Sequence, residues 1–118
     1  MLAFMPAILT GPAMAQTTPT PTPRQYVVVY VEFLPVAALR GGLKLAQLAA
    51  LARKSTGLVS FDVDEQIARP NFYSLVEIWS NATDYQNFLN ADRTKALLAT
   101  MQPLFEAPLD ERPGNLVK

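Results

Sequence analysis

Residues 71–90 read NFYSLVEIWSNATDYQNFLN and contain the signals for one strand and for the start of one helix. In residues 72–79 the side chains alternate between two faces, with Phe72, Ser74, Val76 and Ile78 on one face and Tyr73, Leu75, Glu77 and Trp79 on the other. A period of two predicts a strand, and Arg69-Pro70-Asn71 predicts the turn that leads into it. Ser80 or Asn81 is then predicted to cap a helix, and Asp84 stands three residues after Asn81, as in a capping box.

The helix that starts near Asn81 is expected to continue to Pro103, because proline cannot extend an α-helix. Its apolar residues recur at helical spacing and form one stripe: Tyr85, Phe88, Leu89, Leu97, Leu98 and Met101. This stripe predicts that one face of the helix is buried.

Further elements lie on both sides of this stretch. Residues 26–33 (YVVVYVEF) and 59–63 (VSFDV) have a period of two and are predicted strands, whereas residues 43–54 carry apolar residues at helical spacing. Gly57 follows that helix where a C-terminal cap is expected, and Asn115 to Val117 are predicted to add a short last strand. The order is β-α-β-β-α-β, which is typical of a ferredoxin-like α+β fold.

The composition excludes several classes of function. Ten basic and ten acidic side chains balance, so the chain has no net charge that would attract nucleic acid. It has no cysteine, which excludes disulfides, thiolate catalysis and cysteine-ligated metals, and no histidine, the commonest general base and metal ligand. Any catalysis must therefore use carboxylates, Tyr, Trp, Arg, Lys or the substrate itself.

The N-terminus is predicted to lie outside the folded domain. Residues 1–15 are mostly apolar and end in Ala13-Met14-Ala15, a pattern that signal peptidase recognises, so we expect cleavage before Gln16 and export to a bacterial periplasm. The apolar run is too short to span a bilayer, so no stable membrane insertion is expected after cleavage. The first charged residue is Arg24, so the basic region of a signal peptide is missing, and a cytoplasmic protein with an apolar tail is the alternative.

Residues 16–24 are rich in Thr and Pro, which alternate over most of this segment. Such a run favours extended polyproline II structure, because each proline ring restricts the backbone and removes a hydrogen-bond donor. We expect a tether here and one folded domain at residues 25–118.

Two of the predicted strands are apolar or aromatic on both faces, although two helices can cover only one face of a four-stranded sheet. We therefore expect a homodimer in which two sheets pack face to face and form a dimeric α+β barrel. The interface is predicted to hold Val27, Val29, Val31, Val59, Phe61 and Val76. The other face is predicted to turn toward the helices and to line a pocket with Tyr30, Asp62, Tyr73, Leu75, Glu77, Trp79, Tyr85 and Phe88.

Five short motifs occur in order along the domain: Gly57 to Val63, Arg69 to Phe72, Glu77-Ile78-Trp79, Thr94-Lys95-Ala96 and Pro108 to Arg112. Their order and spacing resemble those of the antibiotic biosynthesis monooxygenase family. The resemblance covers nearly all of residues 26–118. It implies a small dimeric barrel that oxidises a small phenol or hydroquinone with dioxygen, without a flavin or a metal.

The resemblance also implies roles for single residues. The Trp79 N–H and the Tyr85 O–H are expected to donate hydrogen bonds to the substrate anion, and Glu77 is expected to act as a base if burial raises its pKa. Further substrate contacts are expected from Tyr30, Asp62, Leu75 and Phe88. Neither a cofactor nor a metal ion is expected.

Two departures from the family pattern leave the activity open. Phe88 and Arg93 occupy positions where family members often carry histidine, so a histidine-dependent mechanism is absent. The alternative to an enzyme is a non-catalytic module of the same fold that binds a small ligand or serves dimerisation.

The candidate residues have structural alternatives as well. Trp79 and Tyr85 can be large core side chains, because both lie on faces that are predicted to be buried. The carboxylates Asp62 and Glu77 can form ion pairs with basic residues instead of acting as bases.

Overall fold

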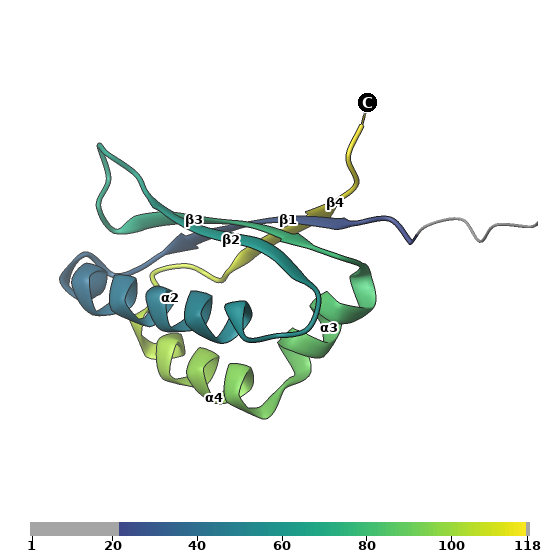
Figure 1. The fold of residues 1–118 in the computed structure, drawn as a ribbon. Helices are drawn as coiled ribbons and strands as arrows, with labels where there is room; N and C mark the ends of the chain where they lie inside the picture. Colours follow the sequence, from purple (N-terminus) through teal and green to yellow (C-terminus); the bar gives the residue numbers. More distant parts are fainter. Residues whose placement is uncertain (1–21, 118) are drawn as a thin grey trace, which may run out of the picture.

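The computed structural model of the protein describes residues 22–117, so the predicted signal peptide and most of the tether lie outside the described residues. Residues 22–117 form two layers, a four-stranded antiparallel sheet and a set of helices that all lie on one face of it (Figure 1). None of these helices is long and apolar enough to cross a membrane.

The sheet has the strand order β2-β3-β1-β4, and every neighbouring pair is antiparallel. Its strands are β1 (Gln25–Glu32), β2 (Leu58–Glu65), β3 (Phe72–Trp79) and β4 (Asp110–Gly114). The helices are α2 (Ala38–Arg53), α3 (Ala82–Asn90) and α4 (Asp92–Met101), with short 3-10 turns η2 (Pro35–Ala37) and η3 (Gln102–Leu104). This arrangement confirms the predicted ferredoxin-like α+β fold.

The first helix starts earlier than predicted and includes both glycines of the Gly41-Gly42 pair. A Cβ atom on Gly41 would lie 2.5 Å from the ring of Phe33, and one on Gly42 would lie 2.5 Å from the Tyr73 hydroxyl. The missing side chains therefore let α2 approach the sheet, and this close approach outweighs the low helix propensity of glycine.

The second helical region is two helices, not the single helix that the sequence predicted. Ala91 has φ −67° and ψ 140°, an extended conformation that ends α3 and precedes α4. Asn90 and Asp92 flank the break, and both residue types favour helix ends over helix interiors. Of the two predicted N-cap candidates, Asn81 is the cap, because its side chain accepts a hydrogen bond from the backbone N–H of Asp84 at 2.8 Å.

The last strand is β4, at residues 110–114, and the prediction of a strand at Asn115 to Val117 was wrong. All five residues of β4 are exposed, so the strand lacks the apolar alternation that would mark it in a sequence. Because β4 pairs only with β1 and forms an edge, it tolerates Pro113, which cannot donate a ladder hydrogen bond.

The assignment of the two sheet faces was also wrong for β1 and β2. Val29 pairs with Leu75 and Val27 with Glu77, and residues directly opposite each other in an antiparallel pair share a face. Val27, Val29, Val31 and Phe61, predicted in a dimer interface, therefore lie on the helix side together with Tyr73, Leu75, Glu77 and Trp79. The alternation along each strand was predicted correctly, but the relative phase of two strands depends on their register.

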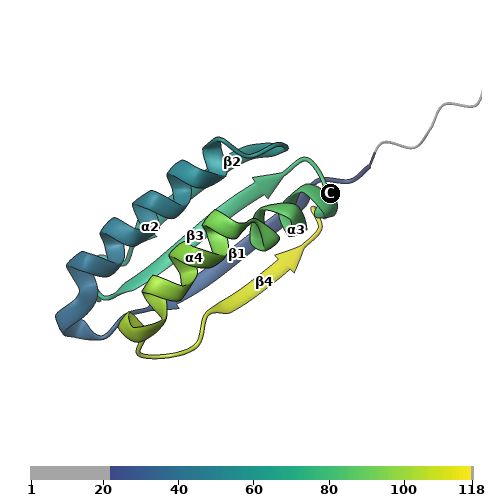
Figure 2. The ribbon, with the colours of Figure 1, turned by 90° about the horizontal axis from the view of Figure 1, so that it is seen from below.

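The hydrophobic core fills the space between the sheet and the helices, of which α2 and α4 run side by side along the strands (Figure 2). Trp79 is completely buried in it, and its ring lies 5.0 Å from that of Phe88 between centroids. Burial of a large aromatic side chain contributes about 1.5–3 kcal/mol through the hydrophobic effect. Trp79 is therefore a structural residue of the hydrophobic core.

The opposite sheet face is not covered by any other described element, and we call it the open face. Its apolar and aromatic members are Tyr26, Val28, Tyr30, Phe72, Val76 and Ile78. Tyr30 is 43% exposed and Val76 is 36% exposed. The guanidinium groups of Arg69 and Arg112 lie over the rings of Phe72 and Tyr30, at 3.4 Å and 5.0 Å from the ring centroids.

Candidate functional site

A cavity of about 90 Å³ lies between the helix side of the sheet and helices α3 and α4. Its apolar lining consists of Val29, Leu48, Leu75, Phe88, Leu89, Leu98 and Leu109. Four polar side chains share the same cavity: Glu77, Tyr85, Thr94 and Glu111. A few polar groups in an apolar cavity are typical of a small-molecule site.

Glu77 is the most unusual residue of the cavity, because it is a carboxylate that is only 4% exposed. Its Oε1 accepts a hydrogen bond from the Trp79 indole N–H at 2.9 Å. Burial raises the pKa of Glu77 most, the Trp79 hydrogen bond lowers it, and the nearby charge of Glu111 raises it; together these effects bring the pKa to about 7. The group can therefore take up or release a proton near neutral pH.

Trp79 stands directly behind this carboxylate. Its N–H is engaged by Glu77, and the side chain is not part of the cavity lining. The Trp79 N–H was predicted to donate a hydrogen bond directly to a substrate. In this structure it is not free to do so, because it already donates to Glu77. Trp79 orients the Glu77 carboxylate and reaches a ligand only through it.

Tyr85 projects from α3 and packs against Trp79, with 6.0 Å between ring centroids. Its hydroxyl donates a hydrogen bond to the Glu111 carboxylate on β4. Burial, followed by the hydrogen bond to Glu111, raises the pKa of Tyr85 well above its ordinary value. Tyr85 therefore stays protonated and remains a hydrogen-bond donor.

The structure brings together most of the predicted site residues. Leu75, Glu77, Tyr85 and Phe88 line the cavity, as the sequence predicted. Their functional roles remain predictions.

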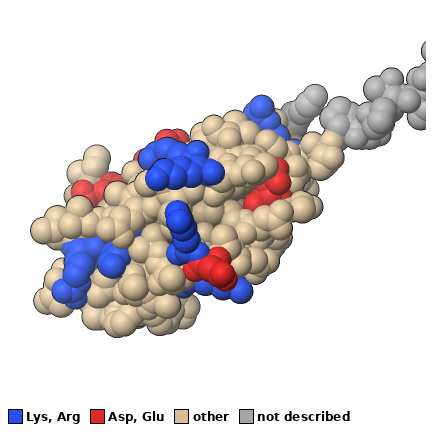
Figure 3. Space-filling model, turned by 60° about the horizontal axis from the view of Figure 1, so that its bottom comes forward, with Lys and Arg blue, Asp and Glu red and all other residues tan. Residues whose placement is uncertain are grey.

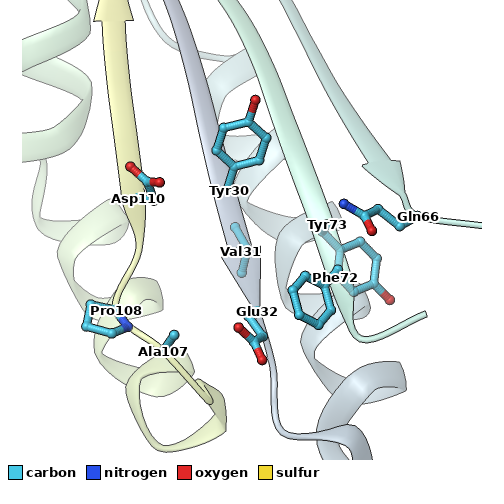
Figure 4. Close-up of a pocket in the computed structure, with 9 residues that line it drawn as sticks. All are labelled: Tyr30, Val31, Glu32, Gln66, Phe72, Tyr73, Ala107, Pro108 and Asp110. Atoms are coloured by element: carbon cyan, nitrogen blue, oxygen red, sulfur yellow. The ribbon is translucent and has the colours of Figure 1, made fainter. Parts of the chain in front are cut away.

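Tyr30 and Asp62 do not join them. Tyr30 is paired with Ser74 and Asp62 with Val76, so both lie on the open face. Their predicted placement beside Glu77 was wrong, because the sequence did not show the register of β1 and β2 against β3. Tyr30 lines a shallow groove of about 300 Å³ on that face, between Phe72 on β3 and Asp110 on β4 (Figure 4).

The sequence analysis missed two polar residues of the cavity, Thr94 and Glu111. Thr94 is 2% exposed and precedes Leu98 and Met101 by four and seven residues, so helical spacing places it on their stripe. Glu111 entered the sequence analysis only within the Pro108 to Arg112 motif, because the last strand was predicted at Asn115 to Val117 and not at residues 110–114. Asp110 and Arg112, the two neighbours of Glu111, form an exposed ion pair with each other at 2.7 Å.

The surface on the helix side carries basic and acidic side chains in small, separate groups (Figure 3). No large patch of one sign is visible on this face. This face therefore shows no strong preference for a charged ligand.

No family model matches the sequence, and no curated protein matches it either. Solved structures do match. An antibiotic biosynthesis monooxygenase aligns with a TM-score of 0.75 and 12% identity, covering 80% of this chain and 99% of its own. A candidate antibiotic biosynthesis monooxygenase from Caulobacter crescentus CB15 aligns with a TM-score of 0.76 and 17% identity over 83% and 93%.

The chain has the antibiotic biosynthesis monooxygenase fold. A conserved protein of unknown function from Bacteroides thetaiotaomicron, described as a possible oxidoreductase, shares it with a TM-score of 0.74 and 17% identity over 80% of this chain and 99% of that one. The resemblance seen in the sequence is thereby confirmed for the fold. A shared fold does not determine function, so a function for this chain has to be argued from the residues of the cavity.

Proposed function

We propose that this protein oxidises a small phenol or hydroquinone with dioxygen and without a cofactor, in the cavity between the sheet and α3 and α4. A phenol with an unsubstituted ring carbon and dioxygen would give a quinone and water, so the substrate supplies all four electrons and no external reductant is needed. One oxygen atom enters the quinone and the other leaves as water.

The main support for this proposal is the Glu77 side chain. It is a buried carboxyl group with a pKa of about 7 that faces an apolar cavity, and a base with a pKa near the working pH is suited to proton transfer. A phenol hydroxyl ionises only near pH 10 in water, as tyrosine does. Removal of its proton by Glu77 would give an electron-rich phenolate, which can transfer electrons to dioxygen.

Tyr85 supplies the second part of the mechanism. Its hydroxyl is a donor at the same cavity, and a donor in a water-poor site stabilises negative charge more strongly than one in water. In this structure the hydroxyl is held by Glu111, an exposed residue of the edge strand. A bound phenolate would compete with Glu111 for this hydrogen bond.

Tyr85→Phe is expected to lower turnover about tenfold to a thousandfold, the range for loss of one preorganised donor. The substitution removes only the hydroxyl, so the ring packing against Trp79 should remain. Oxygen uptake above the autoxidation rate would be measured with a panel of phenols and quinols for both proteins, before and after chelator treatment.

Equal rates for the two proteins would remove Tyr85 from the mechanism, and activity lost on chelation would contradict the cofactor-free reaction. A wild-type protein that binds these compounds but consumes no oxygen would favour the alternative, a non-catalytic ligand-binding module.

We also propose that two copies associate through the open face. Tyr30 and Val76 are more than a third exposed there, and covering such side chains stabilises an assembly by about 25 cal/mol per Å² of apolar surface. The strand register supports an interface on the open face instead of the one expected around Val29, because Val29 lies on the helix side.

Two adjacent substitutions on β1 test this proposal. Val28→Asp places a charge on the open face and is expected to give a folded monomer, whereas Val29→Asp buries an unpaired charge in the core and is expected to prevent folding. Light scattering and circular dichroism would distinguish these states. A wild-type protein that is monomeric at micromolar concentration would contradict the dimer.

A further inference from the structure

The outer face of helix α2 carries large apolar side chains that no other described element covers. Leu39 is 80% exposed and Leu43 is 60% exposed, and Val36 on the preceding turn η2 is 95% exposed. Ala46 and Ala50 are exposed as well and continue the same face of the helix. Single exposed apolar residues are ordinary on a protein surface, but a contiguous row of them marks an interaction site. We call these five residues the α2 stripe.

The α2 stripe has the spacing of a helix–helix contact. Its four members on α2 follow one another at intervals of four, three and four residues. Residues three and four apart are neighbours on a helix surface, and an apolar repeat of about 3.5 residues is the pattern by which helices pack together. The opposite face of α2, with Leu45, Leu48 and Ala52, is buried and packs toward β2 and α4. The helix is therefore apolar on two sides, and this fold buries only one of them.

The charges beside the α2 stripe have one sign. Helix α2 contains Arg40, Lys44 and Arg53 and no acidic residue. Arg53 donates a hydrogen bond to the carbonyl of Phe61 at 2.9 Å, whereas Arg40 and Lys44 form no ion pair within residues 22–117. Basic side chains that flank an apolar row complement acidic side chains on a partner, and such pairs determine which helices associate.

These features distinguish between possible partners. The α2 helices of two copies would bring only basic charges together, so like-charge repulsion disfavours a second copy as the partner. A helix that lies in a lipid surface uses large apolar side chains such as Leu, Phe and Trp, but the α2 stripe ends in Ala46 and Ala50, which bury little apolar surface. Small side chains favour a second helix instead, because they let its backbone approach closely.

We propose that the α2 stripe is a docking site for an amphipathic helix of another protein, which carries acidic residues beside its own apolar row. Leu39 and Leu43 are the apolar anchors of this contact, and Arg40 pairs with the acidic flank. The stripe lies on the outer side of the helix layer, away from the open face, so docking covers neither the open face nor the cavity (Figures 1 and 2). The inference is therefore independent of the proposed oxidation and of the proposed dimer.

Two synthetic peptides test this docking. The first is a fluorescent peptide of about three heptads abcdefg with Leu at a and d and Glu at e and g, where the glutamates disfavour pairing of the peptide with itself. The second has Lys in place of every Glu. Fluorescence anisotropy with the full chain is expected to show binding of the Glu peptide and binding of the Lys peptide that is about tenfold weaker or more, because like charges repel.

Leu43→Glu is expected to weaken binding of the Glu peptide about tenfold or more, because it removes an apolar anchor and adds a charge of the same sign. Leu39→Glu should act in the same way. Leu116→Glu is the matched control, since Leu116 is 65% exposed, close to the 60% of Leu43, and belongs to the segment after β4. Arg40→Glu should weaken the Glu peptide and strengthen the Lys peptide, each about two- to fivefold, the range for exposed ion pairs.

Absence of binding by the Glu peptide, or binding that survives both Leu39→Glu and Leu43→Glu, would overturn the docking site. Equal binding of the two peptides would overturn the acidic partner. Two further measurements test the other occupants. Wild-type protein that sediments with phosphatidylglycerol vesicles, but not after Leu43→Glu, would replace the helix by a lipid surface. Self-association in light scattering that Leu43→Glu abolishes and Leu116→Glu retains would replace it by a second copy.

Discussion

Glu77→Gln is expected to lower oxygen uptake by about 10²- to 10⁴-fold, the usual contribution of a positioned general base. Glutamine has the same length and still accepts the hydrogen bond from Trp79, but it cannot take a proton from the substrate. The wild-type rate should rise with pH and reach half of its maximum near pH 7, because only the ionised form of Glu77 is the base.

The matched control is Glu65→Gln, which makes the same change on an exposed residue of β2 outside the cavity. Oxygen uptake with hydroquinone would be measured from pH 5 to pH 9 for all three proteins. A Glu77→Gln variant with the wild-type rate and the wild-type pH profile would exclude Glu77 as the base.

The same carboxyl group should make the stability of the fold depend on pH. The pKa of Glu77 is raised from 4.5 to about 7 on folding, so between these pH values the folded state holds a proton that the unfolded state has lost. The free energy of unfolding therefore falls as pH rises, and stability that is complete below pH 4.5 is lost as pH passes about 7. At ~1.4 kcal/mol per pKa unit, the loss is about 3 kcal/mol.

Urea unfolding of wild type and Glu77→Gln at pH 4.5 and pH 8 isolates this contribution, because all other groups are shared by the two proteins. We expect the wild type to lose about 3 kcal/mol more than the variant over this range. Equal losses in the two proteins would contradict a carboxyl group that titrates near pH 7 in the fold.

These two predictions are linked. A buried carboxylate close to a second one costs folding free energy at neutral pH, and natural sequences keep such groups mainly at functional sites. Glu77 meets this description, since it lies in the core, faces a cavity and senses the charge of Glu111. A Glu77→Gln variant that is more stable than the wild type at pH 8 and does not consume oxygen would show that Glu77 causes both the pH-dependent stability and the activity.

The sequence alone predicted the strand at residues 72–79, the Asn81 cap and the buried positions of Tyr85 and Phe88. These features are local, because a period of two, a capping residue and a helical stripe can be read within one short segment. Glu77 was identified as a candidate base on the same grounds, together with the resemblance to the monooxygenase family.

The tertiary structure decided what depends on pairing between distant segments. The register of β1 against β3 places Val29 in the core and Tyr30 on the open face, and the pairing of β4 with β1 brings Glu111 to Tyr85. A shift by one residue in an antiparallel pair exchanges the two faces of a strand, and alternation within that strand is the same in either case. The sequence by itself thus determined the elements and the chemical groups of this protein, whereas the packing of those elements decided which groups meet.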